Sequence, residues 1–84
     1  MYEILLEHSV KRFLKKIPVR DFNRIIPDLK ALSENPRPSG CNKLTGSKRD
    51  WRIRVGSYRI IYEIDDAEKV IRVMRIGNRR NIYR

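Results

Sequence analysis

The strongest constraint on the fold is an alternation of apolar and polar side chains in the second half of the sequence. Apolar residues alternate with arginines over 51–55, Gly56-Ser57 interrupts the run, and an apolar residue recurs at every second position over 58–64. A repeat of two residues is typical of a strand with one buried face. Gly-Ser between two such runs is typical of a two-residue hairpin turn. The segment therefore predicts an antiparallel β-hairpin.

The register of this hairpin follows from its turn. With Gly56-Ser57 as the loop, Val55 lies opposite Tyr58 and Arg54 opposite Arg59, and directly opposed residues share a face of the sheet. One face, predicted to pack against the rest of the protein, carries Trp51, Ile53, Val55, Tyr58, Ile60 and Tyr62. The other carries Arg52, Arg54 and Arg59 around Ile61.

The pairing of Arg54 with Arg59 works against folding, because like charges directly opposite one another destabilise a sheet. A local conflict of this kind often marks a functional site. The alternative is that both side chains extend into solvent at little cost. Glu63 lies on the same face of the predicted strand as Arg59. It either orients the Arg59 side chain or forms an ordinary surface ion pair.

Helical spacing dominates the first half of the chain. A short apolar strand over 2–7 precedes Ser9, a plausible N-cap. Apolar residues at 10, 13, 14 and 17 then predict an amphipathic helix that Pro18 ends. A second helical pattern runs from 22 to 32 and contains Pro27, which is expected to kink it.

The remaining segments complete the predicted fold. The run 35–40 is rich in proline and glycine and breaks the helix, whereas Lys69–Ile76 is a further strand that Gly77 ends. The loops between the later strands are too short for crossovers, so the sheet is expected to be antiparallel. The predicted class is α+β: two N-terminal helices packed on one face of an antiparallel sheet of about four strands, in a single domain over 1–84.

Charge indicates the kind of partner. Twenty Lys and Arg against ten Asp and Glu give a formal charge of +10, with an isoelectric point near 10.4. Such an excess destabilises a compact state through self-repulsion unless a polyanion relieves it. Nucleic acid, an anionic membrane surface and an acidic protein all fit, and nucleic acid is the default for a basic globular domain.

Several other kinds of chemistry have no support in the sequence. His8 is the only histidine and Cys41 the only cysteine, so neither histidine-paired ribonuclease chemistry nor zinc binding is expected, and no cofactor or metal is predicted. Asp65 and Asp66 lie in a predicted turn, where we expect them to be solvated. No signal peptide or membrane span is apparent, and a soluble, cytoplasmic protein without membrane contact is expected.

The C-terminal segment adds further candidates. Following the third strand, it is expected to emerge beside Arg54 and Arg59 and to bring Arg79 and Tyr83 to the same concavity. Arginine binds phosphate bidentately, and a tyrosine ring can stack on an unpaired base. For Tyr83 the alternative is an ordinary chain end.

The sequence resembles the RelE/ParE toxin superfamily, and its RelE branch in particular. The resemblance rests on Asn35-Pro36, Lys43–Gly46, Trp51–Val55, Gly56–Ile64 and Ile76–Tyr83. It implies a type II toxin that binds the ribosomal A site and cleaves messenger RNA through attack of a ribose 2′-hydroxyl on the adjacent phosphate. It also implies a cognate antitoxin that covers the basic face.

The resemblance also implies roles for individual residues. Arg52, Arg54, Arg59, Arg79 and Tyr83 correspond to the family's functional positions, of which Arg54, Arg59, Arg79 and Tyr83 are expected to be catalytic. Arg52 either neutralises the phosphate with them or only binds the RNA backbone, and Lys43 and Arg80 are also expected to bind RNA. Some members carry lysines where Arg52 and Arg54 stand, and arginine is a poor general base. The proton acceptor therefore stays open between Tyr83 and the ribosome. Two other functions also stay open: a gyrase inhibitor without nuclease activity, and an RNA-binding or antitoxin-tethering module whose catalysis has decayed.

Overall fold

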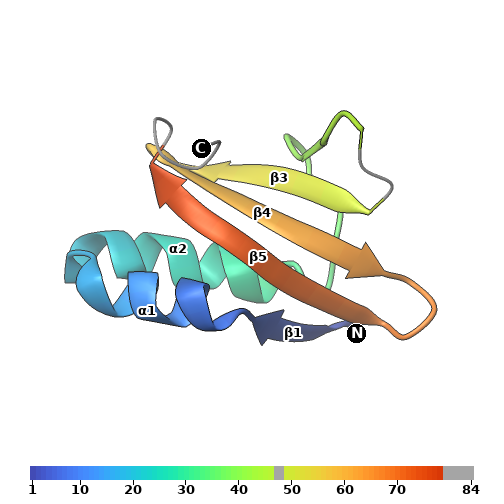
Figure 1. The fold of residues 1–84 in the computed structure, drawn as a ribbon, viewed down its shortest axis with the longest axis horizontal. Coiled ribbons are helices and arrows are strands. Elements are labelled where there is room, and N and C mark those ends of the chain that lie inside the picture. Colours follow the sequence, from blue (N-terminus) through green and yellow to red (C-terminus); the bar gives the residue numbers. More distant parts are fainter. Residues whose placement is uncertain (47–48, 79–84) are drawn as a thin grey trace.

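The computed structural model describes residues 1–46 and 49–78. A short strand, β1 (Glu3–Leu6), leads into two helices, α1 (His8–Lys16) and α2 (Val19–Ala31). The sheet then continues with β2 (Asn42–Lys43), β3 (Asp50–Val55), β4 (Tyr58–Asp65) and β5 (Val70–Asn78). Both helices lie on one side of the sheet (Figure 1), and the other side has no helix over it within the described residues.

The predicted hairpin is confirmed residue by residue. β3 and β4 are antiparallel, with Val55 opposite Tyr58 and Arg54 opposite Arg59. Gly56, the first residue of the turn, has φ +59, whereas Ser57 has no positive φ. This is the pattern of a type II′ turn, whose twist matches that of the flanking strands. The alternation of residue types and the turn together therefore fix the register.

The helix starts earlier than Ser9. The carbonyl of Glu7 accepts hydrogen bonds from the backbone N–H groups of Val10 and Lys11, so Glu7 is the N-cap and Ser9 lies inside the first turn. The prediction of Ser9 as N-cap was wrong. The physical reason is the sheet: the N–H of Glu7 donates to the carbonyl of Val73, which places the junction between strand and helix at this residue. The second helix continues through Pro27 to Ala31.

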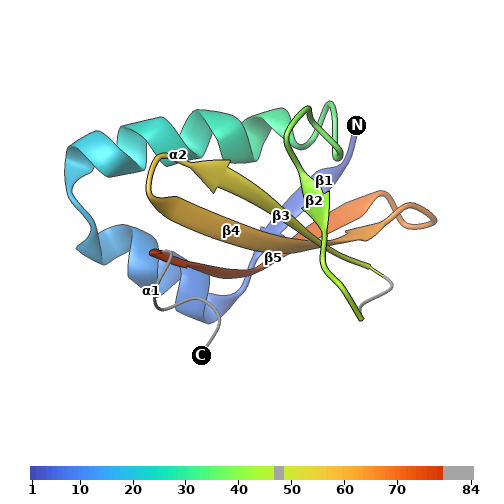
Figure 2. The same cartoon turned by 90° about the horizontal axis from the view of Figure 1, so that it is seen from above.

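The predicted fold class is confirmed, with one difference in the sheet. Within the described residues the sheet has five strands in the order β1-β5-β4-β3-β2, and β1 runs parallel to its neighbour β5. The sheet is therefore mixed. The first strand pairs with the last one, and both helices and three strands separate the two in the chain. A parallel pair needs such a long connection, whereas a short turn joins antiparallel neighbours. Figure 2 shows β1 leading directly into α1, and β1 is the edge strand of the sheet next to β5.

An irregularity in β5 sets which of its side chains face the helices. Ile61 pairs with Arg75 but Tyr62 pairs with Val73, so Met74 is an extra residue in β5. Such a β-bulge shifts the alternation by one position. As a result Arg72 and Arg75, which would lie on opposite faces of a regular strand, share the face turned away from the helices.

The core lies between the helices and the inner face of the sheet. Its buried residues come from both layers: Val10, Leu14, Ile25, Leu29 and Leu32 from the helical half, and Ile53, Val55, Ile60, Tyr62, Ile64, Ile71 and Val73 from the strands. All of the hairpin's predicted inward residues belong to this cluster or pack against it. Among the described residues no helix is long and apolar enough to cross a membrane.

Candidate nucleic-acid interface

Four arginines lie together on the face of the sheet that the helices leave open. Arg54 is directly opposite Arg59, and one step further from the turn Arg52 and Arg75 lie on either side of Ile61. We call Arg52, Arg54, Arg59 and Arg75 the arginine face. Neighbouring strands are about 4.8 Å apart and alternate residues along a strand about 6.6 Å apart. The four side chains therefore arise from a patch small enough to surround one or two phosphate groups.

Arg75 was missed by the sequence reasoning, because the regular alternation of β5 would have placed it among the core residues. The signal was present in the apolar pattern: Ile71 and Val73 are odd-numbered, whereas the next inward residue, Ile76, is even-numbered. Both Ile71 and Ile76 pair with inward residues of β4. A change of parity within one strand indicates a bulge.

The hairpin turn holds Arg59 in place. Its Nη1 donates hydrogen bonds to the carbonyls of Tyr58, at 3.2 Å, and Gly56, at 3.5 Å. The turn itself is close to α2, because a Cβ at Gly56 would lie 3.1 Å from Nη2 of Arg24. Only glycine combines the positive φ with this approach. Arg24 and Arg59 therefore both lie close to Gly56, at the end of the hairpin where Arg54 is opposite Arg59.

Contacts on the inner side anchor the same end of the hairpin to the helices. The hydroxyl of Tyr58 donates to Oδ2 of Asp21 in α2 at 2.7 Å, and this hydrogen bond raises the pKa of Tyr58. The ring of Tyr58 meets that of Phe13 in α1 edge to face, with centroids 5.9 Å apart. Both helices therefore fix the strand ends from which Arg54 and Arg59 project.

Carboxylates occupy the opposite half of the same face. Asp50 is opposite Glu63, and Arg72 lies 3.8 Å from Glu63 and 3.6 Å from Glu7. The ion pair of Glu63 is thus with Arg72, which confirms the second alternative, an ordinary surface ion pair. This ion pair follows from the register, which puts Arg72 directly across from Glu63. The open face is therefore basic near the hairpin turn and mixed in charge at the far end.

The other predicted site residues are distributed as follows. Lys43 pairs with Trp51, so it lies on the face of the sheet that is turned to the helices, away from the arginine face. It lines a different hollow, of about 280 Å³, together with Arg37 and Arg49. Arg79, Arg80 and Tyr83 lie outside the described residues. The last described pairs are Gly77 with Arg59 and Asn78 with Tyr58.

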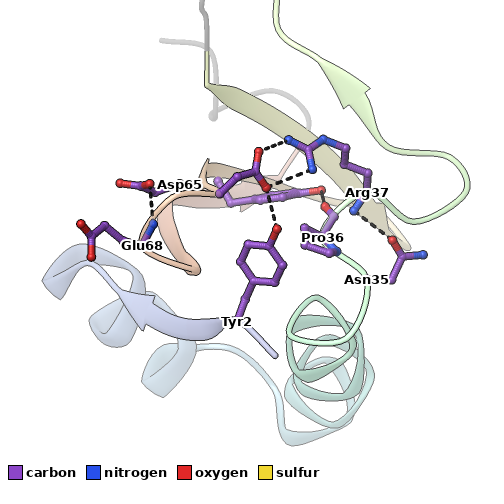
Figure 3. Close-up of polar contacts among 8 residues, drawn as sticks. Tyr2, Asn35, Pro36, Arg37, Asp65 and Glu68 are labelled. Atoms are coloured by element: carbon purple, nitrogen blue, oxygen red, sulfur yellow. Dashed lines mark hydrogen bonds and ion pairs between the residues drawn. The ribbon is translucent and has the colours of Figure 1, made fainter.

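A polar cluster that the sequence reasoning missed joins three distant segments. Asp66 is exposed, as expected, and it also accepts a hydrogen bond from the hydroxyl of Tyr2 at 2.6 Å and pairs with Arg37 at 2.9 Å. The guanidinium of Arg37 also lies 5.2 Å from the centroid of Trp51. Hydrogen bonding to Arg37 lowers the pKa of Asp66. Figure 3 shows Tyr2 and Arg37 reaching the β4–β5 turn from opposite sides.

A groove of about 530 Å³ lies beside the arginine face. It is lined by Asp28, Ala31, Pro38, Ser39, Gly40, Asn42, Ile53 and Arg54. The groove therefore shares Arg54 with the arginine face, and anything that fills it comes close to that residue. Among the described residues no group of three His, Cys, Asp or Glu is placed to hold a metal ion.

Comparisons with known proteins identify the family and agree with the fold. The model of the ParE toxin family of type II toxin–antitoxin systems (parDE) matches residues 4–83. Toxin RelG of Mycobacterium tuberculosis is 27% identical over 84 residues, which cover 99% of this chain and 97% of RelG. The chain is also similar to a structure solved as the archaeal RelE–RelB complex of Pyrococcus horikoshii, with a TM-score of 0.84 and 26% identity over 95% of this chain and 97% of that one.

A second similar structure is the toxin–antitoxin complex RelBE2 of Mycobacterium tuberculosis, with a TM-score of 0.80 and 25% identity over 93% of this chain and 98% of that chain. The sequence, the fold and the matched relatives agree over nearly the whole chain. The protein is therefore a member of the ParE toxin family of type II toxin–antitoxin systems, within the RelE/ParE toxin superfamily.

Proposed function

We propose that this toxin is a ribosome-dependent endoribonuclease that cleaves messenger RNA in the A site and thereby inhibits translation in the cytoplasm. One observation carries the proposal: Arg54 and Arg59 are directly opposed on an open face, with Arg52 and Arg75 beside them. Opposed like charges cost stability. A phosphodiester bound between them would relieve that cost, which explains why such a pair is present in a toxin.

The reaction proposed is transesterification within the message. The 2′-oxygen of a ribose forms a bond to the adjacent phosphorus while the bond from phosphorus to the 5′-oxygen breaks. The products are a 2′,3′-cyclic phosphate and a 5′-hydroxyl, so no water is consumed in this step. In the transition state the phosphoryl oxygens gain negative charge. Fixed guanidinium groups of Arg54 and Arg59 stabilise that charge more than they stabilise the ground state.

Two proton transfers remain to be assigned to groups. The 2′-hydroxyl loses a proton, and the leaving 5′-oxygen gains one from solvent water. Arginine serves poorly as the acceptor of the first proton because it stays charged. His8 is the first residue of α1, in the helix layer. We therefore assign the proton acceptor to Tyr83 or to the ribosome, and assign Arg79 to the phosphate with Arg54 and Arg59. Arg52, Lys43 and Arg80 bind RNA outside the reacting bond.

A cognate antitoxin is the second proposed partner. The solved relatives include complexes of RelE with RelB, and the formal charge of +10 favours a partner with acidic segments. An antitoxin segment lying over the arginine face would compete with the message for the same guanidinium groups. In this proposal the chain 1–84 acts as one toxin domain.

The proposal is tested by expressing the protein without antitoxin and mapping the 5′ ends of cellular transcripts after a short pulse. The wild type is expected to arrest growth and to produce new 5′-hydroxyl ends within codons. Arg59→Ala and Arg54→Ala are expected to lower cleavage by a factor of about 10²–10³, the usual cost of losing one such stabilising group. Arg12→Ala, which removes an exposed charge from α1, is the control and should cleave as the wild type does.

A gyrase inhibitor is the second candidate, favoured by the match to a family described by its ParE member. It predicts accumulation of DNA cleavage complexes with intact messenger RNA ends. The same pulse experiment distinguishes the two functions. Growth arrest without new transcript ends, or full toxicity of folded Arg54→Ala and Arg59→Ala variants, would rule out the endoribonuclease.

A further inference from the structure

We propose that Arg52 and Arg75 form a second phosphate subsite, which holds the phosphodiester next to the one that is cleaved. This inference rests on the proposed nuclease function and adds to it a residue, Arg75, and a place for the neighbouring nucleotide. The ligand is a single-stranded RNA backbone.

The register defines two rows of side chains across the open face. The first row is Arg54, Arg59 and Gly77, and the second is Arg52, Ile61 and Arg75. In the first row the arginines are on adjacent strands. In the second row Ile61 separates them, so their backbones are about 10 Å apart, twice the spacing of neighbouring strands. The second row can therefore hold a group between two guanidiniums, with an apolar side chain beneath it.

Ile61 provides the floor of this subsite. It lies on the face opposite the core, yet only 5% of it is exposed. Directly opposed side chains in a sheet have Cβ atoms about 5 Å apart, so the aliphatic stems of Arg52 and Arg75 lie beside it. Arginine commonly packs its stem on apolar surface while the charged end reaches outward. The register thus places both arginines on the open face, where an RNA backbone lying across the strands would meet them; Arg75 is exposed and Arg52 is half-buried.

The bulge at Met74 brings Arg75 to this row. In a strand of regular alternation, Arg75 would have the parity of Val73, which is fully buried. The extra residue turns Arg75 to the open face, opposite Ile61. β-Bulges are frequent next to active sites, where they redirect a side chain. The bulge thus adds a cation beside Arg52, Arg54 and Arg59, which favours binding at the expense of stability.

The acidic half of the face limits where the backbone can run. Beyond the second row, Glu63 follows Ile61 at the next outward position of β4, with Asp50 opposite it and Arg72 paired with it. Phosphates are attracted to the two arginine rows and repelled by these carboxylates. The two rows therefore accommodate two consecutive phosphodiesters and no third one along the strands.

The test uses ribosomes programmed with a message that has 2′-deoxyribose in the A-site codon, so that the full-length toxin binds without cutting. One phosphodiester at a time is replaced with an uncharged methylphosphonate. Binding is measured for the wild type, Arg75→Gln and the control Arg72→Gln, which lies on the same strand and face but pairs with Glu63 and Glu7. Thermal unfolding confirms that each variant is folded.

At one phosphodiester adjoining the cleaved one, the methylphosphonate is expected to weaken wild-type binding roughly tenfold, the cost of one charge-assisted contact. In Arg75→Gln this penalty should largely disappear, whereas in Arg72→Gln it should persist. An equal penalty in wild type and Arg75→Gln at every adjoining position would overturn the subsite. A wild type that leaves an all-ribose message intact on the same ribosomes would instead refute the proposed nuclease function.

Discussion

Replacing Arg54 with glutamine is expected to stabilise the fold while it lowers cleavage. Arg54 is exposed and directly opposite Arg59, and a like-charge pair of this geometry costs roughly 0.2–1 kcal/mol. Arg54→Gln removes the repulsion and keeps a long polar side chain on the strand. Arg54 is the better choice of the two, because Arg59 also donates hydrogen bonds to the turn carbonyls, which a substitution would remove.

The size of the effect follows from the length of the chain. For a domain of 60–100 residues, 1 kcal/mol shifts the melting temperature by about 4–8 °C. We therefore expect Arg54→Gln to melt about 1–8 °C higher than the wild type at low salt. The gain should shrink in about 1 M salt, where the Debye length falls to about 3 Å and the repulsion is already screened. Cleavage on ribosomes should fall by a factor of about 10²–10³.

The assay is thermal unfolding followed by circular dichroism at low and high salt, combined with the single and double variants of Arg54 and Arg59. If repulsion is the cause, the two substitutions are not additive, because either one alone removes the pair. A lower melting temperature for Arg54→Gln, or a gain that does not depend on salt, would refute the reasoning that this face is under electrostatic strain.

Three further predictions concern the framework. Gly56→Ala should destabilise the protein by about 1–2 kcal/mol, measured by urea unfolding, because it imposes a positive φ on a residue with a Cβ and crowds Arg24 at 3.1 Å. Burial raises the pKa of Tyr62, so the protonated side chain stabilises the fold fully below about pH 10. Above that pH the free energy of unfolding falls by up to about 1.4 kcal/mol per pH unit until the pKa of Tyr62 in the folded protein is passed. Tyr62→Phe should therefore make the free energy of unfolding depend less steeply on pH above pH 10. The pKa of Asp66 is lowered by Arg37, so its contribution is present above about pH 4 and lost in acid, and Asp66→Asn should weaken the acid dependence of the melting temperature.

The hairpin and its two faces could be predicted because the information is local. A two-residue turn and a strict alternation determine which residues are opposite, and Arg54 opposite Arg59 follows without any knowledge of the rest of the chain. The two helices were predicted for the same reason, since their apolar spacing is a property of a few turns. Only the helix start was misplaced, because the contact that fixes it, Glu7 with Val73, joins residues far apart in the sequence.

The features that escaped prediction all depend on long-range contacts. The parallel pairing of β1 with β5 joins the first strand to the last, and no local pattern specifies that partner. The contacts of Asp66 with Tyr2 and Arg37 span 64 and 29 positions. Arg75 is an intermediate case: the parity change in β5 is visible in the sequence, but its outcome depends on the register with β4.

The two faces of the sheet have opposite effects on stability, and this explains the distribution of the remaining contacts. The inner face contributes seven buried strand residues to the core, while the open face near the turn contributes repulsion. The ends of the strands need additional support, because repulsion between Arg54 and Arg59 tends to separate β3 from β4. The hydrogen bond from Tyr58 to Asp21 holds the turn end of the hairpin to α2. The contacts of Asp66 hold the opposite end to Tyr2, directly before β1, and to the loop after α2. Substitutions at these anchors should therefore reduce the stability that permits an arginine pair on the open face, even though neither anchor belongs to the arginine face.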